Sequence, residues 1–400
     1  GLIGFFMAFG IGANDVANAM GTSVGSKAIT LKQAVIIAAI FEFLGAYFAG
    51  GEVTSTIRKG IVDPSIYSDD VNIFIIGMLS SLLAAGLWLL MASSKGWPVS
   101  TTHSIVGAIV GFVLISKGAS NVSWGTVGGI ASSWITSPLV SGLMAFLLYL
   151  SAKHLILDRN NPTKAAVSVI PFYSFFVTAV ICLVTARKGL KHVGINWTDN
   201  EIYLFTFVLS LLVSVFTFLF LFFKSSKLSS NVENQFGILM IITACAMAFA
   251  HGSNDVANAI GPIAAVVSIV TSDGTIQTSS ELNSWVLLLG AVGIVFGLAI
   301  LGRHVIKTVG EKITTLTPSL GFSANMATAS TVLAASYLGF PISTTHTLVG
   351  GVIGVGLARG YKYLDLNSIK RIFLSWIITI PVGATFTILF YVILRLIFNV

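Results

Sequence analysis

Charged side chains are scarce in this sequence. Only 9% of its 400 residues are Asp, Glu, Lys or Arg, whereas soluble globular chains carry about 25%. Hydrophobic residues make up 55% of the chain, and the mean hydropathy is +0.92. These proportions exclude a soluble globular domain. They predict an all-α polytopic membrane protein, since helices satisfy their own backbone hydrogen bonds in lipid.

Cysteine is nearly absent as well. The two cysteines, Cys182 and Cys245, both lie in apolar runs, which indicates buried thiols and excludes a disulfide framework or a cysteine metal site. The net charge of +7 comes from basic residues scattered between apolar runs. This distribution fits loops beside anionic lipid headgroups, and we expect no nucleic-acid partner.

Long apolar stretches dominate what is present. A membrane-spanning helix needs about 20 residues, and eight stretches approach this length: 33–50, 71–92, 124–150, 166–186, 202–223, 284–301, 322–338 and 372–398. Four further apolar stretches are interrupted: 1–11 followed by 15–25, 97–116, 236–250 followed by 255–270, and 340–357. The pattern predicts ten to twelve helices, some of them discontinuous. Residues 97–116 could form either a re-entrant hairpin or a full span.

Two motifs occur twice. The decapeptide Gly12–Gly21 returns as Gly252–Gly261, and Trp97–Gly107 returns as Phe340–Gly350. Residues 1–150 and 236–400 are therefore predicted to be two copies of one transmembrane unit. Residues 151–235 would connect them through two further spans and a polar linker at 224–235. Paired repeats with interrupted helices indicate a secondary transporter with its site near the membrane midplane. The sequence leaves open whether the repeats are parallel or inverted.

The first motif brings ionisable groups into apolar sequence. Its polar members are Asn14, Asp15 and Asn18 in one copy, and Asn254, Asp255 and Asn258 in the other. An ionisable side chain near the bilayer centre costs about 2.5–3.5 kcal/mol, so such residues usually mark a functional site. Because Asn and Asp favour helix N-caps, a half-helix is expected to begin near Asp15 and near Asp255. Carboxylate and amide oxygens there suit Na⁺, although helix capping alone would be a purely structural alternative.

The second motif, Pro-x-Ser-Thr-Thr-His, also predicts a helix start. Free backbone N–H groups and hydroxyls at such an end can bind an anion. No Lys or Arg occurs in either motif, so a buried anion would need bound cations to offset its charge and that of the aspartates. A protonated phosphate could also donate to an aspartate, whereas ionised sulfate could not. Glu42 is a further candidate cation ligand, and His103 and His346 are either proton-coupling groups or neutral, locally bonded rings.

Together, the duplicated Gly-x-Asn-Asp-Val-Ala-Asn-Ala and Pro-x-Ser-Thr-Thr-His segments resemble the inorganic phosphate transporter family of Pit-type permeases and sodium–phosphate symporters. The resemblance covers essentially the whole chain, and the short linker is similar to that of prokaryotic members. It implies about twelve membrane helices in two inverted repeats, with broken helices and re-entrant hairpins. It also implies a homodimer in a bacterial or archaeal cell membrane that imports phosphate with sodium by alternating access.

The resemblance assigns site residues by position. Phosphate would be bound by Asn14, Asp15, Ser100, Thr101, Thr102, Asn254, Asp255, Ser343, Thr344 and Thr345. Sodium would be bound by Asp15, Asn18, Thr101, Asp255, Asn258 and Thr344. The expected partners are phosphate, sodium, membrane lipid and a second copy of the chain, with no resident cofactor.

Three alternatives remain. The same scaffold could carry phosphate or metal–phosphate with protons, or it could carry sulfate. From another class, an intramembrane hydrolase could use Asp15 and Asp255 as a catalytic pair. Catalysis does not require duplicated Asn and Ser/Thr residues, whereas a pseudo-symmetric ion site does. We therefore expect a transporter and not an enzyme.

Overall fold

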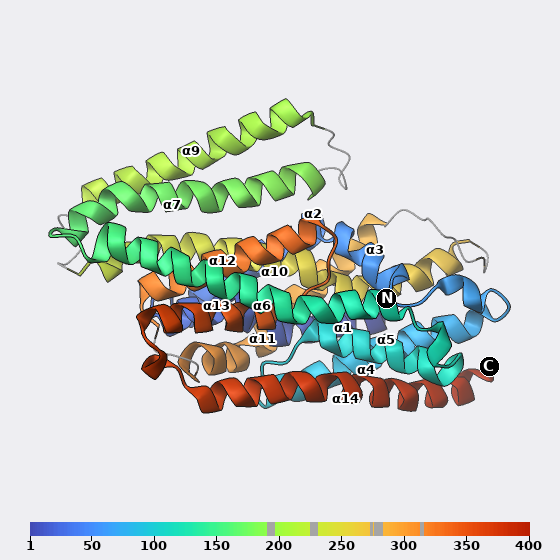
Figure 1. Cartoon of the computed structure of the whole chain (residues 1–400). Helices are drawn as coiled ribbons and strands as arrows, with labels where there is room; N and C mark the ends of the chain where they lie inside the picture. Colours follow the sequence, from blue (N-terminus) through green and yellow to red (C-terminus); the bar gives the residue numbers. More distant parts are fainter. Residues whose placement is uncertain (190–196, 225–230, 273–274, 276–282, 313–315) are drawn as a thin grey trace.

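The computed structural model describes residues 1–189, 197–224, 231–272, 275, 283–312 and 316–400, and these contain helices and no strands. The helices lie roughly along one direction, and both chain termini lie at the same end of the bundle (Figure 1). The first half comprises α1 (Leu2–Gly25), α2 (Leu31–Ala49), α3 (Gly51–Lys59), α4 (Val71–Ser94), α5 (Thr101–Ser116) and α6 (Trp124–Ala152).

The connecting segment contains α7 (Pro162–Val184) and α9 (Asp199–Lys224), which pair with each other along one outer side of the bundle (Figure 1). The second half comprises α10 (Glu233–Val270), α11 (Ser284–Lys312), α12 (Pro318–Tyr337), α13 (Thr344–Arg359) and α14 (Leu366–Phe398). Of the predicted polar linker, residues 225–230 lie outside the described part of the chain.

Nine helices in the described residues are long and apolar enough to cross a membrane, which confirms a polytopic membrane protein. Helices α5 and α13 have 16 residues each, or about 24 Å at 1.5 Å per residue, short of a hydrocarbon core of about 30 Å. Each follows a longer helix through an extended tip, so α4–α5 and α12–α13 form two helical hairpins. Residues 97–116 thus form the tip and the second arm of a helical hairpin, and its re-entrance into the membrane stays a prediction.

The predicted breaks at the first motif are wrong. Helices α1 and α10 run without interruption through both copies of the decapeptide. The glycines serve close helix packing: a Cβ atom at Gly12 would overlap the backbone of Ile294, and one at Gly252 would overlap the backbone of Glu42. The Asn and Asp side chains bond to other elements, so they do not compete with the helical backbone.

These close approaches also align the two halves. Gly12 meets Ile294 on α11 in the way that Gly252 meets Glu42 on α2. Gly297 likewise meets the backbone of Phe9, and Gly45 meets that of Phe249. Position n of α1 thus corresponds to n + 240 of α10, and position n of α2–α3 to n + 252 of α11. The two motif-bearing helices, α1 and α10, contact each other.

Candidate functional site

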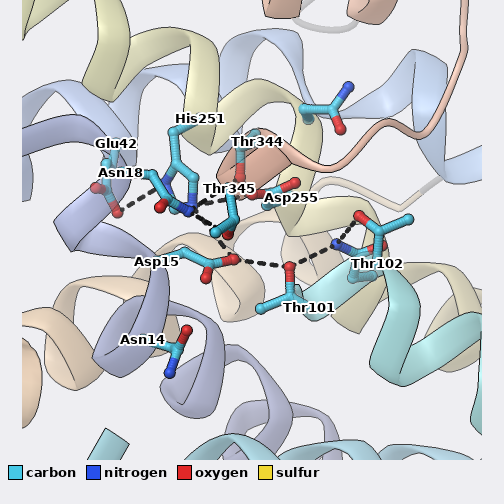
Figure 2. Close-up of polar contacts among 12 residues, drawn as sticks. Asn14, Asp15, Asn18, Glu42, Thr101, Thr102, His251, Asp255, Thr344 and Thr345 are labelled. Atoms are coloured by element: carbon cyan, nitrogen blue, oxygen red, sulfur yellow. Dashed lines mark hydrogen bonds and ion pairs between the residues drawn. The ribbon is translucent and has the colours of Figure 1, made fainter. Parts of the chain in front are cut away.

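Two buried aspartates form the centre of the site. Asp15 on α1 and Asp255 on α10 are both fully buried. Thr101 Oγ1, at the start of α5, donates to Asp15 Oδ2 at 2.7 Å, and Thr344 Oγ1, at the start of α13, donates to Asp255 Oδ2 at 2.6 Å (Figure 2). The structure therefore brings the two sequence motifs together twice, in matching geometry.

The asparagines connect the two halves. Asn18 Nδ2 donates to Thr345 Oγ1 at 2.8 Å and to Thr344 Oγ1 at 3.3 Å. Asn258 Nδ2 donates at 3.3 Å to the hydroxyls of both Thr101 and Thr102. Each aspartate thus binds the threonine of its own half, and each asparagine binds threonines of the other half. The result is one continuous polar centre and not two separate ones.

Asn14 and Asn254 hold the hairpin tips. Asn14 Nδ2 donates to Trp97 O at 2.9 Å, and its Oδ1 accepts from Val99 N at 3.1 Å. Asn254 repeats both bonds with the backbone of Phe340 and Ile342, at 3.2 and 3.4 Å. Both amide groups are occupied by the hairpins in this conformation. They position the tips, and their predicted contact with phosphate is untested.

The remaining hydroxyls of the second motif shape the same tips. Ser100 and Ser343 are the N-caps of α5 and α13, each accepting from the backbone N–H three residues later at 3.2 Å. The helix start predicted at this motif is therefore confirmed. Thr102 Oγ1 donates to Ile342 O at 2.9 Å, and Thr345 Oγ1 donates to Val99 O at 3.3 Å. Each hairpin tip is bonded to the other.

A histidine that the sequence analysis overlooked lies among the acidic residues. His251 Nε2 is 3.0 Å from Asp255 Oδ2 and 3.8 Å from Asp15 Oδ2, while its Nδ1 is 3.3 Å from Glu42 Oε2 (Figure 2). His251 and Glu42 are both fully buried. The aspartates therefore have a potential basic partner, contrary to the view that only bound cations could balance them. Glu42 was predicted as an additional cation ligand. It is linked to the two aspartates by the His251 ring, which lies between them.

The His251–Glu42 pair breaks the internal symmetry. The corresponding positions in the other half are Ile11, 240 residues before His251, and Ile294, 252 residues after Glu42. Sequence signals for the pair were available, because His251 precedes Asp255 by one helical turn and therefore faces the same way. The pair does not stand out among the duplicated residues, because only one half carries it.

Several oxygens of the centre have spare capacity. Among the described residues, Asp15 Oδ1, Asp255 Oδ1 and Asn258 Oδ1 are buried and accept no hydrogen bond. One ligand atom each from Asp15, His251 and Asp255 lies within 4.8 Å of the others. Buried carboxylate and amide oxygens without donors are hard ligands that suit a small cation. The unbonded oxygens therefore fit an ion such as Na⁺, whereas the His251 ring nitrogen is not a hard ligand.

His103 and His346 lie beside this centre. Their ring centroids are 4.4 Å apart, and each ring contacts a tryptophan. His346 stacks on Trp376 with ring centroids 3.4 Å apart, and His103 lies tilted against Trp134 with centroids 3.8 Å apart. Each Nδ1 faces the backbone carbonyl of the opposite tryptophan, at 3.3 and 3.1 Å. The four rings therefore connect the starts of α5 and α13 to α6 and α14.

A polytopic helical bundle with a pseudo-symmetric polar centre, closed by two hairpin tips, is the architecture of a secondary transporter. Comparison with known proteins gives the cargo. Residues 11–387 match the model of the phosphate transporter family. A Haemophilus influenzae protein named as a phosphate permease is 52% identical, and the match covers 100% of this chain and 96% of that protein.

Two further similar proteins are also phosphate transporters by name. The chloroplastic inorganic phosphate transporter 2-1 of Arabidopsis thaliana is 43% identical, over 97% of this chain and 70% of that protein. A solved structure, named the sodium-dependent phosphate transporter, superimposes with a TM-score of 0.89 at 43% identity, covering 99% of this chain and 98% of that one. The chain belongs to the phosphate transporter family. It is a transporter and not an enzyme, so the intramembrane hydrolase alternative is wrong.

Proposed function

We propose that this protein imports inorganic phosphate together with sodium ions, by alternating access around the central site. The observation that carries the proposal is the single polar centre shared by both halves, in which each buried aspartate binds a threonine of its own half and each asparagine binds threonines of the other half. The similar solved structure is named as sodium-dependent, which supports sodium as the coupled ion.

In this proposal sodium ions bind at Asp15, Asn18, Thr101, Asp255, Asn258 and Thr344. Their oxygens are buried, and Asp15 Oδ1, Asp255 Oδ1 and Asn258 Oδ1 have no hydrogen-bond donor among the described residues. Bound cations would offset the negative charge that otherwise repels an anion. This electrostatic requirement makes phosphate binding depend on sodium, which is the basis of obligatory coupling.

Phosphate is proposed to lie between the hairpin tips. The starts of α5 and α13 present backbone N–H groups and the hydroxyls of Thr101, Thr102, Thr344 and Thr345. A helix N-terminus favours an anion through its free N–H groups and partial positive charge. The N-cap residues Ser100 and Ser343 fix the direction of these helix starts. The amides of Asn14 and Asn254 would act by holding the tips in place.

A proton-coupled phosphate permease is the second candidate, and His251 is the observation that favours it. Its two ring nitrogens face carboxylates on both sides, and imidazole is the side chain best suited to proton exchange near neutral pH. The sodium-coupled and proton-coupled candidates share the same fold and differ in the ion gradient that drives phosphate uptake.

The test is phosphate uptake into proteoliposomes under an imposed gradient. With a sodium gradient and equal pH on both sides, sodium coupling predicts accumulation of radioactive phosphate that stops when potassium replaces sodium. If a pH gradient without sodium drives accumulation equally well, the coupling ion is the proton and not sodium. Uptake of sulfate in preference to phosphate would contradict the proposed cargo.

We further propose that residues 1–150 and 236–400 are inverted repeats in a bacterial or archaeal cell membrane, joined by residues 151–235. The matched glycine contacts and matched Asn14 and Asn254 bonds support two equivalent units. Cysteine accessibility from each side of the membrane tests the inversion: labels at residues 118 and 360, which follow α5 and α13, should react from opposite sides.

A further inference from the structure

A basic pocket lies at the C-terminal end of α1, where that helix meets α11. Its volume is about 530 Å³, and no acidic residue lines it. The residues around it are Val24, Gly25, Lys27, Leu31, Arg303, His304, Ile306 and Lys307. Three of these side chains are permanently charged cations under ordinary conditions. Lys27, Arg303 and Lys307 are exposed and line the same cavity, so its wall carries three positive charges and no negative one, which suits an oxyanion such as a phosphate group.

The basic residues of the pocket are not repeated at the equivalent positions of the other half. By the alignment of the two halves, Lys27 corresponds to Val267, Arg303 to Gly51 and Lys307 to Ser55. His304 corresponds to an acidic residue, Glu52. The repeated fold therefore does not require these basic residues, because the other copy packs α10 against α2 and α3 without them.

A buried polar face of α1 leads from the pocket toward the central site. Thr22 Oγ1 donates to Asn325 Oδ1 at 2.5 Å, and Asn325 Nδ2 donates to Ser23 Oγ at 3.2 Å. Thr22 follows Asn18 by one helical turn, so both occupy the same face of α1.

The equivalent positions in the other half are apolar. Thr22 and Ser23 correspond to Pro262 and Ile263, and Asn325 corresponds to Leu82. The polar face, like the basic pocket that it reaches, is therefore not repeated in the other half. Gly25 is ten residues beyond Asp15, which places the pocket about 15 Å along α1 from the central aspartates.

We propose that this pocket, defined by Lys27, Arg303 and Lys307, is a second anion site that binds a phosphate group. Its occupant is either free phosphate at one end of the route to the central site or the headgroup of an anionic lipid. Both present anionic phosphate oxygens to the same three cations. Lys and Arg commonly gather in loops on one side of a membrane, but that tendency does not direct three of them into one pocket.

The decisive variant replaces all three cations: Lys27→Gln, Arg303→Gln and Lys307→Gln. The matched control, Lys153→Gln with Arg159→Gln and Lys362→Gln, removes the same charge from exposed side chains outside the pocket. A charge-preserving variant, Lys27→Arg with Arg303→Lys, controls for folding. The probe is radioactive inorganic phosphate, bound at equilibrium to the whole chain in nanodiscs of neutral lipid with sodium present.

The expected result is a second, weaker phosphate site in the wild type, in the control and in the charge-preserving variant. In the triple variant its affinity falls about tenfold or more, because each unit charge near the anion contributes even in water. High salt should abolish the difference. In a second arm, native mass spectrometry after reconstitution with anionic lipid detects retained lipid. Retention by the wild type and loss in the triple variant identifies a lipid headgroup as the occupant.

The inference fails if the triple variant binds phosphate and retains anionic lipid as the control does. This failure is distinct from that of the proposed function. Sodium-driven uptake by the wild type tests the central site, and the number of weak phosphate sites tests the pocket.

Discussion

His251 and Glu42 depend on each other inside the membrane. Both are fully buried, and His251 Nδ1 lies 3.3 Å from Glu42 Oε2. Removing one member of a buried ionic pair costs about 3–5 kcal/mol, because the other is left without compensation, whereas replacing both by apolar residues is often neutral. The equivalent positions of the other half, Ile11 and Ile294, are both apolar.

We therefore expect strongly non-additive effects in a double-mutant cycle. His251→Ile alone should lower the thermal unfolding midpoint of the detergent-solubilised protein, because Glu42 loses its partner. Adding Glu42→Ile should recover much of the loss while sodium-driven transport stays impaired. If the two substitutions lower the midpoint independently, the pair is not coupled.

At the scale of the helices, two glycines allow α1 and α10 to pack backbone to backbone against their neighbours. At Gly12 an added methyl group would overlap the backbone of Ile294 on α11, and at Gly252 it would overlap that of Glu42 on α2. Neither helix can yield without moving a central aspartate, which lies three residues further along the same helix.

The predicted effect is a loss of stability and of transport in Gly12→Ala, by about 1–3 kcal/mol of unfolding free energy, as for an overpacked core. Gly237→Ala is the matched control, because Gly237 lies inside α10 with nothing within 4 Å of the new methyl group. That control should stabilise the helix by about 0.5–1 kcal/mol. Equal thermal midpoints for the two variants would contradict the close-packing role.

The long helices and the helix starts after Ser100 and Ser343 followed from the sequence, because apolar runs and N-capping serines are local signals. The pairing of α5 with α4 and of α13 with α12 did not, because it depends on contacts between helices. The predicted breaks near Asp15 and Asp255 failed for a different reason. Gly12 contacts Ile294, 282 residues away, and no local pattern distinguishes a glycine that breaks a helix from one that lets two helices touch. His251 was missed because only one half carries it, and its role depends on Glu42, which belongs to another helix.

At the scale of the whole molecule, sodium coupling has an electrical consequence. If the cations carry more charge than the phosphate, each cycle moves net positive charge inward, and each unit charge gains about 2.3 kcal/mol per 100 mV. Solid-supported membrane recordings should then show inward positive currents when phosphate is added in sodium. Traces that stay silent while radioactive phosphate is taken up would indicate electroneutral coupling.

The homodimer implied by the family resemblance stays a prediction. Native mass spectrometry of the protein extracted from its membrane should give twice the mass of the 42.2 kDa chain. A single-chain mass under conditions that preserve transport would exclude it.

The central claim is that Asp15 and Asp255 hold the sodium ions that allow phosphate to bind. Equilibrium binding of radioactive sodium to the purified protein, with and without phosphate, measures this directly. We predict that phosphate increases sodium binding by the wild type, and that Asp15→Asn and Asp255→Asn each abolish the increase, while Asp158→Asn at an exposed position leaves it intact. If both central variants bind sodium as the wild type does, and phosphate increases that binding equally, the claim is contradicted.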